Sequence, residues 1–118
     1  MDCVFCKIVE KQISSDNIYE DDEILSFKDS NPQAPIHALV IPKKHIVSVD
    51  KLRENEEKII GHMFLKIKDI AKKLNCRNGY RIVSNCGKGA GQAVFHLHFH
   101  LLGGRALAWP PGLKNDLF

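Results

Sequence analysis

The 118-residue sequence has no apolar run long enough to cross a membrane, and its start, Met1-Asp2-Cys3, has none of the features of a signal peptide. The simplest expectation is an intracellular, cytoplasmic protein, with the nucleus as an alternative, in which the four cysteines are reduced rather than paired in disulfides. The sequence also lacks a strong excess or cluster of charge of one sign. The formal net charge is only +3, and the lysines are spread along the chain. We therefore expect no membrane and no nucleic-acid partner, although mild basicity suits a small anionic ligand.

The residues that are present suffice for one domain, which we expect to span residues 1–118, with 44% hydrophobic and 26% charged residues. Apolar residues recur at three- and four-residue spacing from Glu54 to Leu74, which predicts one long helix that stops before Asn78-Gly79. Strands are expected at Ile18–Glu20, Ile24–Lys28, Ile36–Ile41, Tyr80–Ser84 and Val94–Leu102, and a short helix at Val4–Glu10. Hairpins around one long helix indicate an antiparallel α+β fold.

The most informative segment is His96-Leu97-His98-Phe99-His100. Successive side chains of a strand alternate between its faces, so the three imidazoles are expected on one face of the predicted last strand. Imidazole can act as a nucleophile, a proton carrier or a metal ligand near neutral pH. The alternatives are a row of half-exposed strand histidines or a surface metal-binding tract. Either would cost the strand good packing residues without compensation, so the pattern favours a functional site.

A glycine-rich loop, Asn85–Gln92, leads into the histidine segment. Its three glycines in five positions allow backbone N–H groups to turn toward an anion without obstruction by Cβ atoms. Alone, the loop is better interpreted as a flexible hairpin connection. Next to a nucleophilic imidazole, it indicates a phosphoryl-transfer site.

The run from His96 to Leu102 matches the His-φ-His-φ-His-φ-φ signature of the histidine-triad (HIT) family, in which φ is apolar. Other segments that resemble the family are Tyr19-Glu20-Asp21-Asp22, Ser30-Asn31-Pro32-Gln33-Ala34-Pro35, His37-Ala38-Leu39-Val40-Ile41-Pro42-Lys43-Lys44-His45, Gly91-Gln92 and Leu102-Gly103-Gly104-Arg105. Trp109-Pro110-Pro111-Gly112 resembles the Hint branch specifically. The resemblance implies a HIT-like fold with a five-stranded antiparallel sheet, and a homodimer whose two sheets join into one of ten strands. The tail from about residue 103 is then expected to dock near the partner subunit's site.

The same resemblance implies a site for a purine nucleoside monophosphate, such as AMP or GMP, and nucleoside phosphoramidase activity. By position, His98 would attack the α-phosphorus and form a covalent nucleotidyl-histidine, while His100 would bind the phosphate oxygens. His96 and His37 complete the predicted catalytic set, with His37 in a supporting role. The matching substrate-binding positions are Phe5, Ile8, Phe27 and Leu39 for the base, Asp29 for the ribose, Asn85, Gly91, Gln92, Ala93 and Val94 around the phosphate, and Trp109 at the leaving group.

One of these positions departs from the family, because Ala93 stands where many Hint members have a serine. A hydroxyl that could contact the phosphate or the departing nitrogen is therefore missing. Losing one such donor costs about 1–3 kcal/mol of transition-state stabilisation if nothing replaces it. We expect slower turnover rather than inactivity.

A zinc site is the remaining expectation. Cys3 and Cys6 have the spacing of a metal knuckle, but a lone pair is only half of a site. In HIT branches with this pair, zinc is also held by two histidines, which correspond to His45 and His96. We expect a structural zinc that clamps the N-terminus, and no organic cofactor. The alternative is two packed, reduced cysteines and a surface His45.

Other functions remain open at this point. A dinucleoside polyphosphate hydrolase is a neighbouring enzyme class, which the Trp109 tail disfavours. A non-enzymatic nucleotide-binding scaffold dimer is an alternative of another kind. A zinc-knuckle nucleic-acid binder is disfavoured by the single cysteine pair and the lack of a surface that combines aromatic and basic residues. His62 is expected to be an ordinary, partly buried helix residue.

Overall fold

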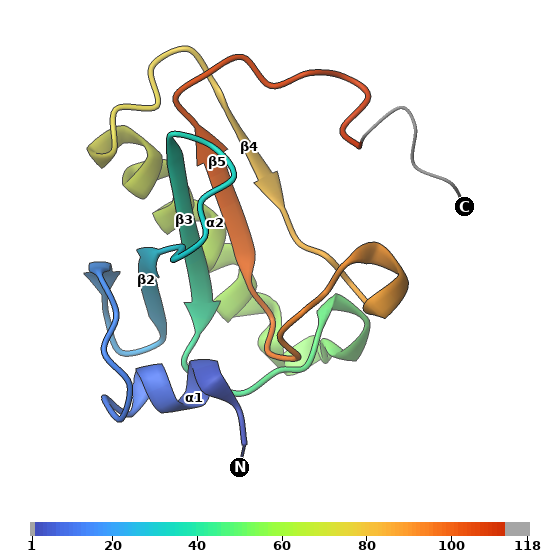
Figure 1. The fold of residues 1–118 in the computed structure, drawn as a ribbon. Coiled ribbons are helices and arrows are strands. Elements are labelled where there is room, and N and C mark those ends of the chain that lie inside the picture. Colours follow the sequence, from blue (N-terminus) through green and yellow to red (C-terminus); the bar gives the residue numbers. More distant parts are fainter. Residues whose placement is uncertain (1, 113–118) are drawn as a thin grey trace.

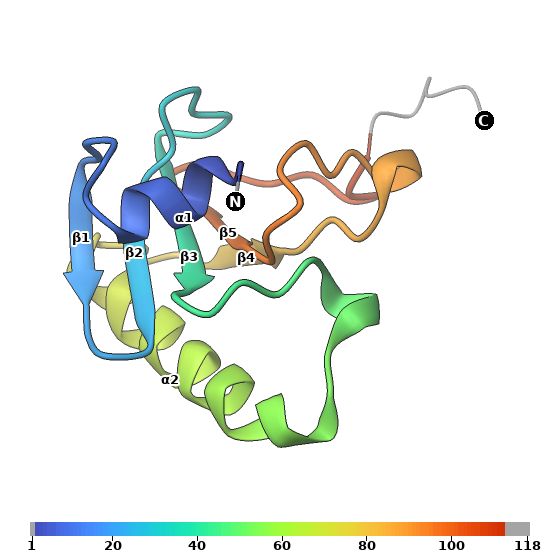
Figure 2. The same cartoon turned by 90° about the horizontal axis from the view of Figure 1, so that it is seen from below.

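The computed structural model describes residues 2–112, so Met1 and the last six residues of the predicted domain lie outside it. It has an antiparallel five-stranded sheet in the order β1-β2-β3-β5-β4, with helices on both faces (Figures 1 and 2). The elements are α1 (Val4–Val9), β1 (Asn17–Glu20), β2 (Ile24–Lys28), β3 (Ile36–Pro42), α2 (Glu57–Lys73), β4 (Tyr80–Val83) and β5 (Phe99–Gly103), with 3-10 turns at Val49–Lys51, Glu54–Glu56 and Lys88–Ala90. No helix within residues 2–112 is long and apolar enough to span a membrane.

Helix α2 covers one face of the sheet, as its apolar stripe predicts. Its buried residues pack on alternate residues of the central strands, and this core comprises Ile24, Ala38, Val40, Ile46, Met63, Ile67, Ile70, Ala71, Leu97, Phe99 and Leu101. The helix ends at Lys73 rather than just before Asn78-Gly79, because Asn75 adopts the left-handed conformation at φ 62°. Asparagine tolerates that conformation better than most residues, so the helix ends at Lys73, one residue before the end of the predicted apolar stripe at Leu74.

Helix α1 lies on the opposite face, where a second apolar cluster forms. With six residues it is too short to be stable alone, and its burial against the sheet supplies the stability that it lacks. Cys3 caps its N-terminus, because the Cys3 sulfur accepts a hydrogen bond from the Cys6 backbone N–H. The buried cluster comprises Cys3, Phe5, Ile8, Leu25, Phe27, Leu39 and Ile41.

The last strand differs from its prediction, because regular pairing begins at Phe99 rather than at Val94. The preceding segment pairs with the loop after β3, and Leu97 N–H donates to the carbonyl of Ile46 at 2.6 Å. His96 and His98 therefore lie outside the β-ladder, and only His100 lies within it. The alternation itself continues through this segment, because Leu97, Phe99 and Leu101 belong to the core under α2. The rings of His96 and His98 instead contact Phe5, and the rings of His98 and His100 lie 5.0 Å apart.

The other boundaries agree with the sequence to within a residue or two. Strand β2 matches its prediction, β1 begins one residue earlier, β3 includes Pro42, and β4 ends one residue earlier. Helix α1 ends at Val9 rather than at Glu10. The first turn of the predicted long helix, Glu54–Glu56, is a 3-10 turn.

Candidate functional site

His98 occupies the centre of the candidate site and is almost fully buried. Its Nδ1 lies 2.7 Å from the backbone carbonyl of His96. A carbonyl can only accept, so Nδ1 carries the hydrogen and Nε2 of the neutral ring keeps its lone pair. The ring of Phe5 packs edge-on against the His98 ring, with centroids 5.2 Å apart at 88°. His98 is thus fixed both in tautomer and in orientation.

His37 and His100 form a second, ordered pair on the same face. The backbone N–H of Gln33 donates to His37 Nδ1 at 2.9 Å, so the hydrogen of the neutral His37 ring is on Nε2. That nitrogen lies 2.8 Å from His100 Nδ1, which must accept. His100 Nε2 is therefore the protonated nitrogen of the neutral ring and can donate to a ligand. Together with His98, the pair offers one lone pair and one N–H donor side by side, since the His98 and His100 ring centroids are 5.0 Å apart.

Burial keeps these imidazoles neutral. Burial lowers the pKa of His100 to about 4, with His98 and His37 adding to the effect and Asp29 opposing it. The pKa of His37 is also lowered by burial, while Asp29 opposes the shift. Both rings are therefore neutral at pH 7, as the tautomers above require.

Asp29 joins this network after the end of β2. Its Oδ2 lies 3.3 Å from His37 Nε2 and 4.0 Å from His100 Nδ1. Its Oδ1 accepts a hydrogen bond from Asn31 N–H at 2.8 Å, which holds the carboxylate in place. A ligand hydroxyl near Asp29 would thus meet a fixed acceptor next to the two histidines.

The predicted base-pocket residues come together from three elements. Phe5 and Ile8 of α1 lie with Phe27 of β2 and Leu39 of β3 in one buried cluster, and Val94 packs against it. The rings of Phe5 and Phe27 meet edge-on with centroids 5.6 Å apart. This apolar cluster borders His98 through Phe5.

The glycine-rich loop is held by Gln92. Its side-chain oxygen accepts from Gly87 N–H at 2.8 Å, and its nitrogen donates to the carbonyls of Val47 and Val94 at 2.8 and 3.1 Å. Both polar atoms are thus used to fix the loop. Gly91 takes the left-handed conformation at φ 91°, which favours glycine.

Three predicted site residues make no side-chain hydrogen bond or ring contact with His98 or His100 within residues 2–112. Asn85 follows β4 in the first part of the loop, and Ala93 contributes to a cavity of about 400 Å³ beside Cys3 and His45. Trp109 is 80% exposed on the C-terminal tail, with the Arg81 guanidinium carbon 6.0 Å from its ring centroid. Within residues 2–112, Trp109 makes no ring contact with a histidine of its own chain.

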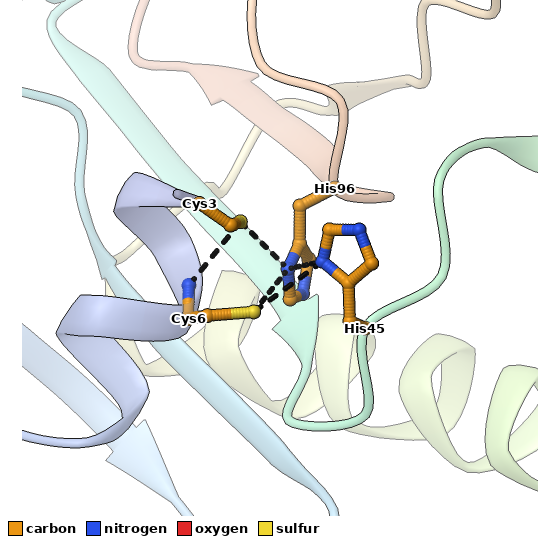
Figure 3. A group of neighbouring side chains, drawn as sticks. All are labelled: Cys3, Cys6, His45 and His96. Atoms are coloured by element: carbon orange, nitrogen blue, oxygen red, sulfur yellow. Dashed lines mark hydrogen bonds between the residues drawn. The ribbon is translucent and has the colours of Figure 1, made fainter. Parts of the chain in front are cut away.

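The predicted zinc ligands form a compact cluster (Figure 3). His96 Nδ1 lies 3.4 Å from the Cys3 sulfur, 3.6 Å from the Cys6 sulfur and 3.1 Å from His45 Nδ1, and the Cys6 sulfur lies 3.3 Å from His45 Nδ1. Tetrahedral zinc with ordinary Zn–S and Zn–N bonds has ligand-to-ligand separations of about 3.3–3.8 Å. Three of the four separations lie in this range and the one between His45 and His96 is slightly shorter, so the donor set fits a structural zinc.

The hydrogen-bond partner of His96 also fits this geometry. His96 Nε2 lies 2.8 Å from the carbonyl of Pro42, so it carries the hydrogen and Nδ1 presents its lone pair to the cluster. Burial lowers the pKa of His96 to about 4, and burial together with the neighbouring Cys3 raises that of Cys6 to about 11. At pH 7 these shifts keep the His96 ring neutral and Cys6 a thiol.

A second set of potential metal ligands, Asp29, His37 and His100, does not fit a metal. A metal on His37 Nε2 would require the ring hydrogen on Nδ1, where it would oppose the Gln33 N–H. The hydrogen-bonded network accounts for these three residues fully.

Two features were missed by the sequence analysis. His62 does not merely lie on the helix edge, because its Nε2 is 2.6 Å from Asp21 Oδ2 in the β1–β2 turn. That carboxylate also accepts hydrogen bonds from Tyr19 and from two backbone N–H groups, which hold its pKa well below the usual range despite burial.

Arg81 was not singled out either, although it donates hydrogen bonds to the carbonyls of Leu107 and Ala108. Both contacts join distant segments, so no local pattern could have found them.

Comparisons with known proteins find similar sequences and a similar fold. The family model described as scavenger mRNA decapping enzyme C-term binding matches residues 2–108. An uncharacterized HIT-like protein of Synechococcus elongatus is 49% identical over 111 residues, which cover 94% of this chain and 97% of that protein. The crystal structure of a HIT family hydrolase from Legionella pneumophila has 42% identity and a TM-score of 0.92, covering 94% of this chain and all of that one. A histidine triad protein from Clostridium difficile has 46% identity and a TM-score of 0.88, covering 92% and 95%.

Proposed function

The chain belongs to the histidine-triad (HIT) family, and from that premise we propose that it is a nucleoside phosphoramidase of the Hint type. The proposed reaction is hydrolysis of the P–N bond of a purine nucleoside 5′-phosphoramidate to a nucleoside monophosphate, such as AMP or GMP, and an amine. The observation that carries the proposal is the 2.7 Å contact from His98 Nδ1 to the His96 carbonyl, which leaves Nε2 as a free nucleophile.

The reaction proceeds in two displacements at phosphorus. His98 Nε2 first attacks the α-phosphorus, and the amine departs with the electron pair of the P–N bond and a proton taken from solvent. The positive charge on the nucleotidyl-imidazolium is stabilised by the His96 carbonyl, because Nδ1–H already points at it. Water then attacks the same phosphorus, and the histidine leaves as the neutral ring.

His100 stabilises the phosphate during both steps. Its Nε2–H donates to a phosphoryl oxygen, and His37 maintains this tautomer by donating to His100 Nδ1. The Gln33 N–H fixes His37 in turn. His37 is a positioning residue in this scheme, since it acts through His100.

The nucleoside is held by the groups that border the triad. A purine base lies in the apolar cluster of Phe5, Ile8, Phe27 and Leu39, and a ribose hydroxyl donates to Asp29. N–H groups of the loop near Gly91 and Val94 contribute to the phosphate site. Gln92 keeps that loop in shape through three hydrogen bonds.

Zinc is proposed as a structural cofactor held by Cys3, Cys6, His45 and His96. When bound, it supplies a cross-link between the N-terminus and the triad segment and takes no part in the reaction. The four donor atoms are spaced for a tetrahedral ion. The set requires reduced thiols, which favours a cytoplasmic location.

A homodimer is proposed as the assembly. Strand β4 lies at one edge of the sheet and is paired on one side only within the described chain, so a second copy can pair along it and give ten strands. Partly exposed aromatic side chains, Tyr80 on this strand and Phe64 on α2, are available for burial. The tail with Trp109 is then free to reach the partner's site.

Turnover of adenosine 5′-phosphoramidate tests this function. The wild-type protein is expected to release AMP, and His98→Asn to lose at least about a thousandfold in kcat, because the nucleophile is gone. His62→Asn is the matched control, since His62 bonds only to the distant Asp21 turn. Binding of AMP without any hydrolysis by the wild type would contradict the proposal and favour a nucleotide-binding scaffold.

A further inference from the structure

The apolar cluster, the histidines and the edge strand β4 follow one another in a single direction across the sheet. On the face opposite α2, the apolar cluster lies over β2 and β3, and the histidines follow on β3 and in the β5 segment. The next strand is β4, at the edge. A substrate with its base in the apolar cluster and its phosphorus at His98 therefore extends its leaving group toward β4.

Arg81 on β4 is the charged residue that follows the histidines in this direction. In the β4–β5 pairing, Val83 lies opposite His100 and Arg81 opposite Leu102, so their side chains share the face of His100. Ile82, between them, points to the α2 core instead. Arg81 and His100 are thus diagonal neighbours, about 7–8 Å apart, within reach of a long side chain.

A cavity of about 640 Å³ adjoins Arg81 at the start of β4. Its lining comes from the turn after α2, the start of β4 and the segment after β5, and among the described residues it includes Arg77, Arg81 and Arg105 but no carboxylate. Within residues 2–112, none of the three arginines forms an ion pair. Arg81 and Arg105 donate only to backbone carbonyls.

Three guanidinium groups that have no carboxylate partner within residues 2–112 surround one cavity, which favours an oxyanion as its occupant. Each guanidinium has five N–H donors, and the carbonyl contacts of Arg81 involve only one of its nitrogens. Carboxylate and phosphate both match the planar fork of such donors. A neutral amine leaving group would leave these charges without a partner.

We propose that Arg77, Arg81 and Arg105 form a leaving-group subsite that selects nucleoside phosphoramidates whose amine carries a carboxylate or a phosphate. This inference rests on the proposed function, and it adds a substrate class to it. Arg81 lies diagonally across from His100 in the β4–β5 pairing, and Arg77 and Arg105 line the same cavity.

A set of matched substrates tests the subsite. Adenosine 5′-phosphoramidates of 3-aminopropanoic acid, its amide and 2-aminoethyl phosphate share the reacting bond and differ in the charge of the leaving group. We expect the wild-type kcat/KM to be about tenfold higher for at least one anionic substrate than for the amide, and the better of the two identifies the preferred oxyanion.

Substitution of the arginines tests whether they cause the preference for anionic leaving groups. Arg81→Gln is expected to reduce the ratio of anionic to neutral kcat/KM several-fold, and Arg77→Gln to reduce it to a lesser extent. Arg77 makes no side-chain hydrogen bond within the described chain, so its substitution leaves the tail contacts intact and keeps the test valid if Arg81→Gln does not fold. Arg53→Gln, outside the cavity, is the matched control with an unchanged ratio.

The outcomes separate the two proposals. Equal rates for all three substrates, or a preference that survives both variants, would overturn the subsite while leaving the phosphoramidase intact. Hydrolysis of none of them would overturn the proposed function itself. Loss of the preference in both variants, with the Arg53→Gln ratio unchanged, would support the subsite.

Discussion

At the scale of single residues, the proposed chemistry depends on which nitrogen of each imidazole carries the hydrogen. Backbone groups decide this at three positions, because a carbonyl faces His96 Nε2, another faces His98 Nδ1, and an N–H faces His37 Nδ1. The first choice creates a metal ligand, the second a nucleophile and the third, through His100, a donor to phosphate. Three similar residues thus take three roles through their local hydrogen bonds.

If the fold keeps His100 neutral, the free energy of unfolding should fall as the pH is lowered. Its pKa is about 4 in the fold and about 6.5 in an unfolded chain, so between these values the unfolded state binds more protons. The contribution to the free energy of unfolding is full above pH 6.5 and is lost as the pH falls toward 4. The groups that face His100 are His98, His37 and Asp29, with Arg81 diagonally across.

Urea unfolding of wild type and His100→Asn at pH 7 and pH 5 measures this contribution. The wild type should lose more free energy of unfolding between the two pH values than the variant does. An equal loss in both proteins would mean that His100 is not held neutral by the fold.

Ala93 should limit the rate. Restoring the serine hydroxyl in Ala93→Ser is expected to raise kcat for adenosine 5′-phosphoramidate, since a donor of this kind is worth about 1–3 kcal/mol in the transition state. Steady-state kinetics of the two proteins under identical conditions measure the effect. Identical kcat values would show that another group already supplies the hydrogen bond.

At the scale of elements, helix α1 connects the proposed zinc ligands to the proposed nucleophile, His98. Cys3 and Cys6 lie at its N-terminal end, and Phe5 between them contacts the rings of His96 and His98. The helix has six residues and makes few hydrogen bonds of its own. A cross-link at Cys3 and Cys6 therefore also fixes the wall of the base pocket.

Removal of zinc should loosen α1 and weaken nucleotide binding together. Cys3→Ser is expected to lose bound zinc, to speed amide exchange at residues 4–9 and to raise the Kd for AMP several-fold. Hydrogen exchange, metal analysis and calorimetry measure the three effects. Cys76→Ser, a cysteine outside the cluster, serves as control, and full protection of residues 4–9 in a zinc-free Cys3→Ser protein would contradict the coupling.

Periodicity and motifs were sufficient to predict the elements, but not the way in which the histidine segment leaves the sheet. The stripe of α2 and the alternation in β2 and β3 are local patterns, and their boundaries were predicted to within a few residues. The departure at His96–His98 depends on the Ile46 carbonyl and on Pro42, which come from a different part of the chain. Likewise, the pairing of Asp21 with His62 and of Arg81 with the tail required the fold.

At the scale of the whole molecule, the strand order runs from the proposed base pocket to the proposed leaving-group side, and β4 is unpaired along its outer edge within residues 2–112. Both features bear on assembly, because a partner along β4 would bring a second tail toward the leaving-group side. The ten-stranded dimer is a prediction from the family resemblance alone, whereas the arginine cavity beside β4 became visible only in three dimensions.

The native mass should be twice that of the 13.3 kDa chain. Sedimentation equilibrium at micromolar concentration is expected to show a dimer, because the unpaired edge of β4 and the exposed aromatic residues need a partner. A monomer at every concentration tested would remove both the ten-stranded sheet and the reach of Trp109 into a second site.

The most direct test of the central claim is the mass of the enzyme during turnover. Rapid mixing with adenosine 5′-phosphoramidate, quenching and peptide mass analysis should reveal one AMP group on His98, and none on His96 or His100. An adduct on another residue, or active enzyme that never carries one, would contradict the account.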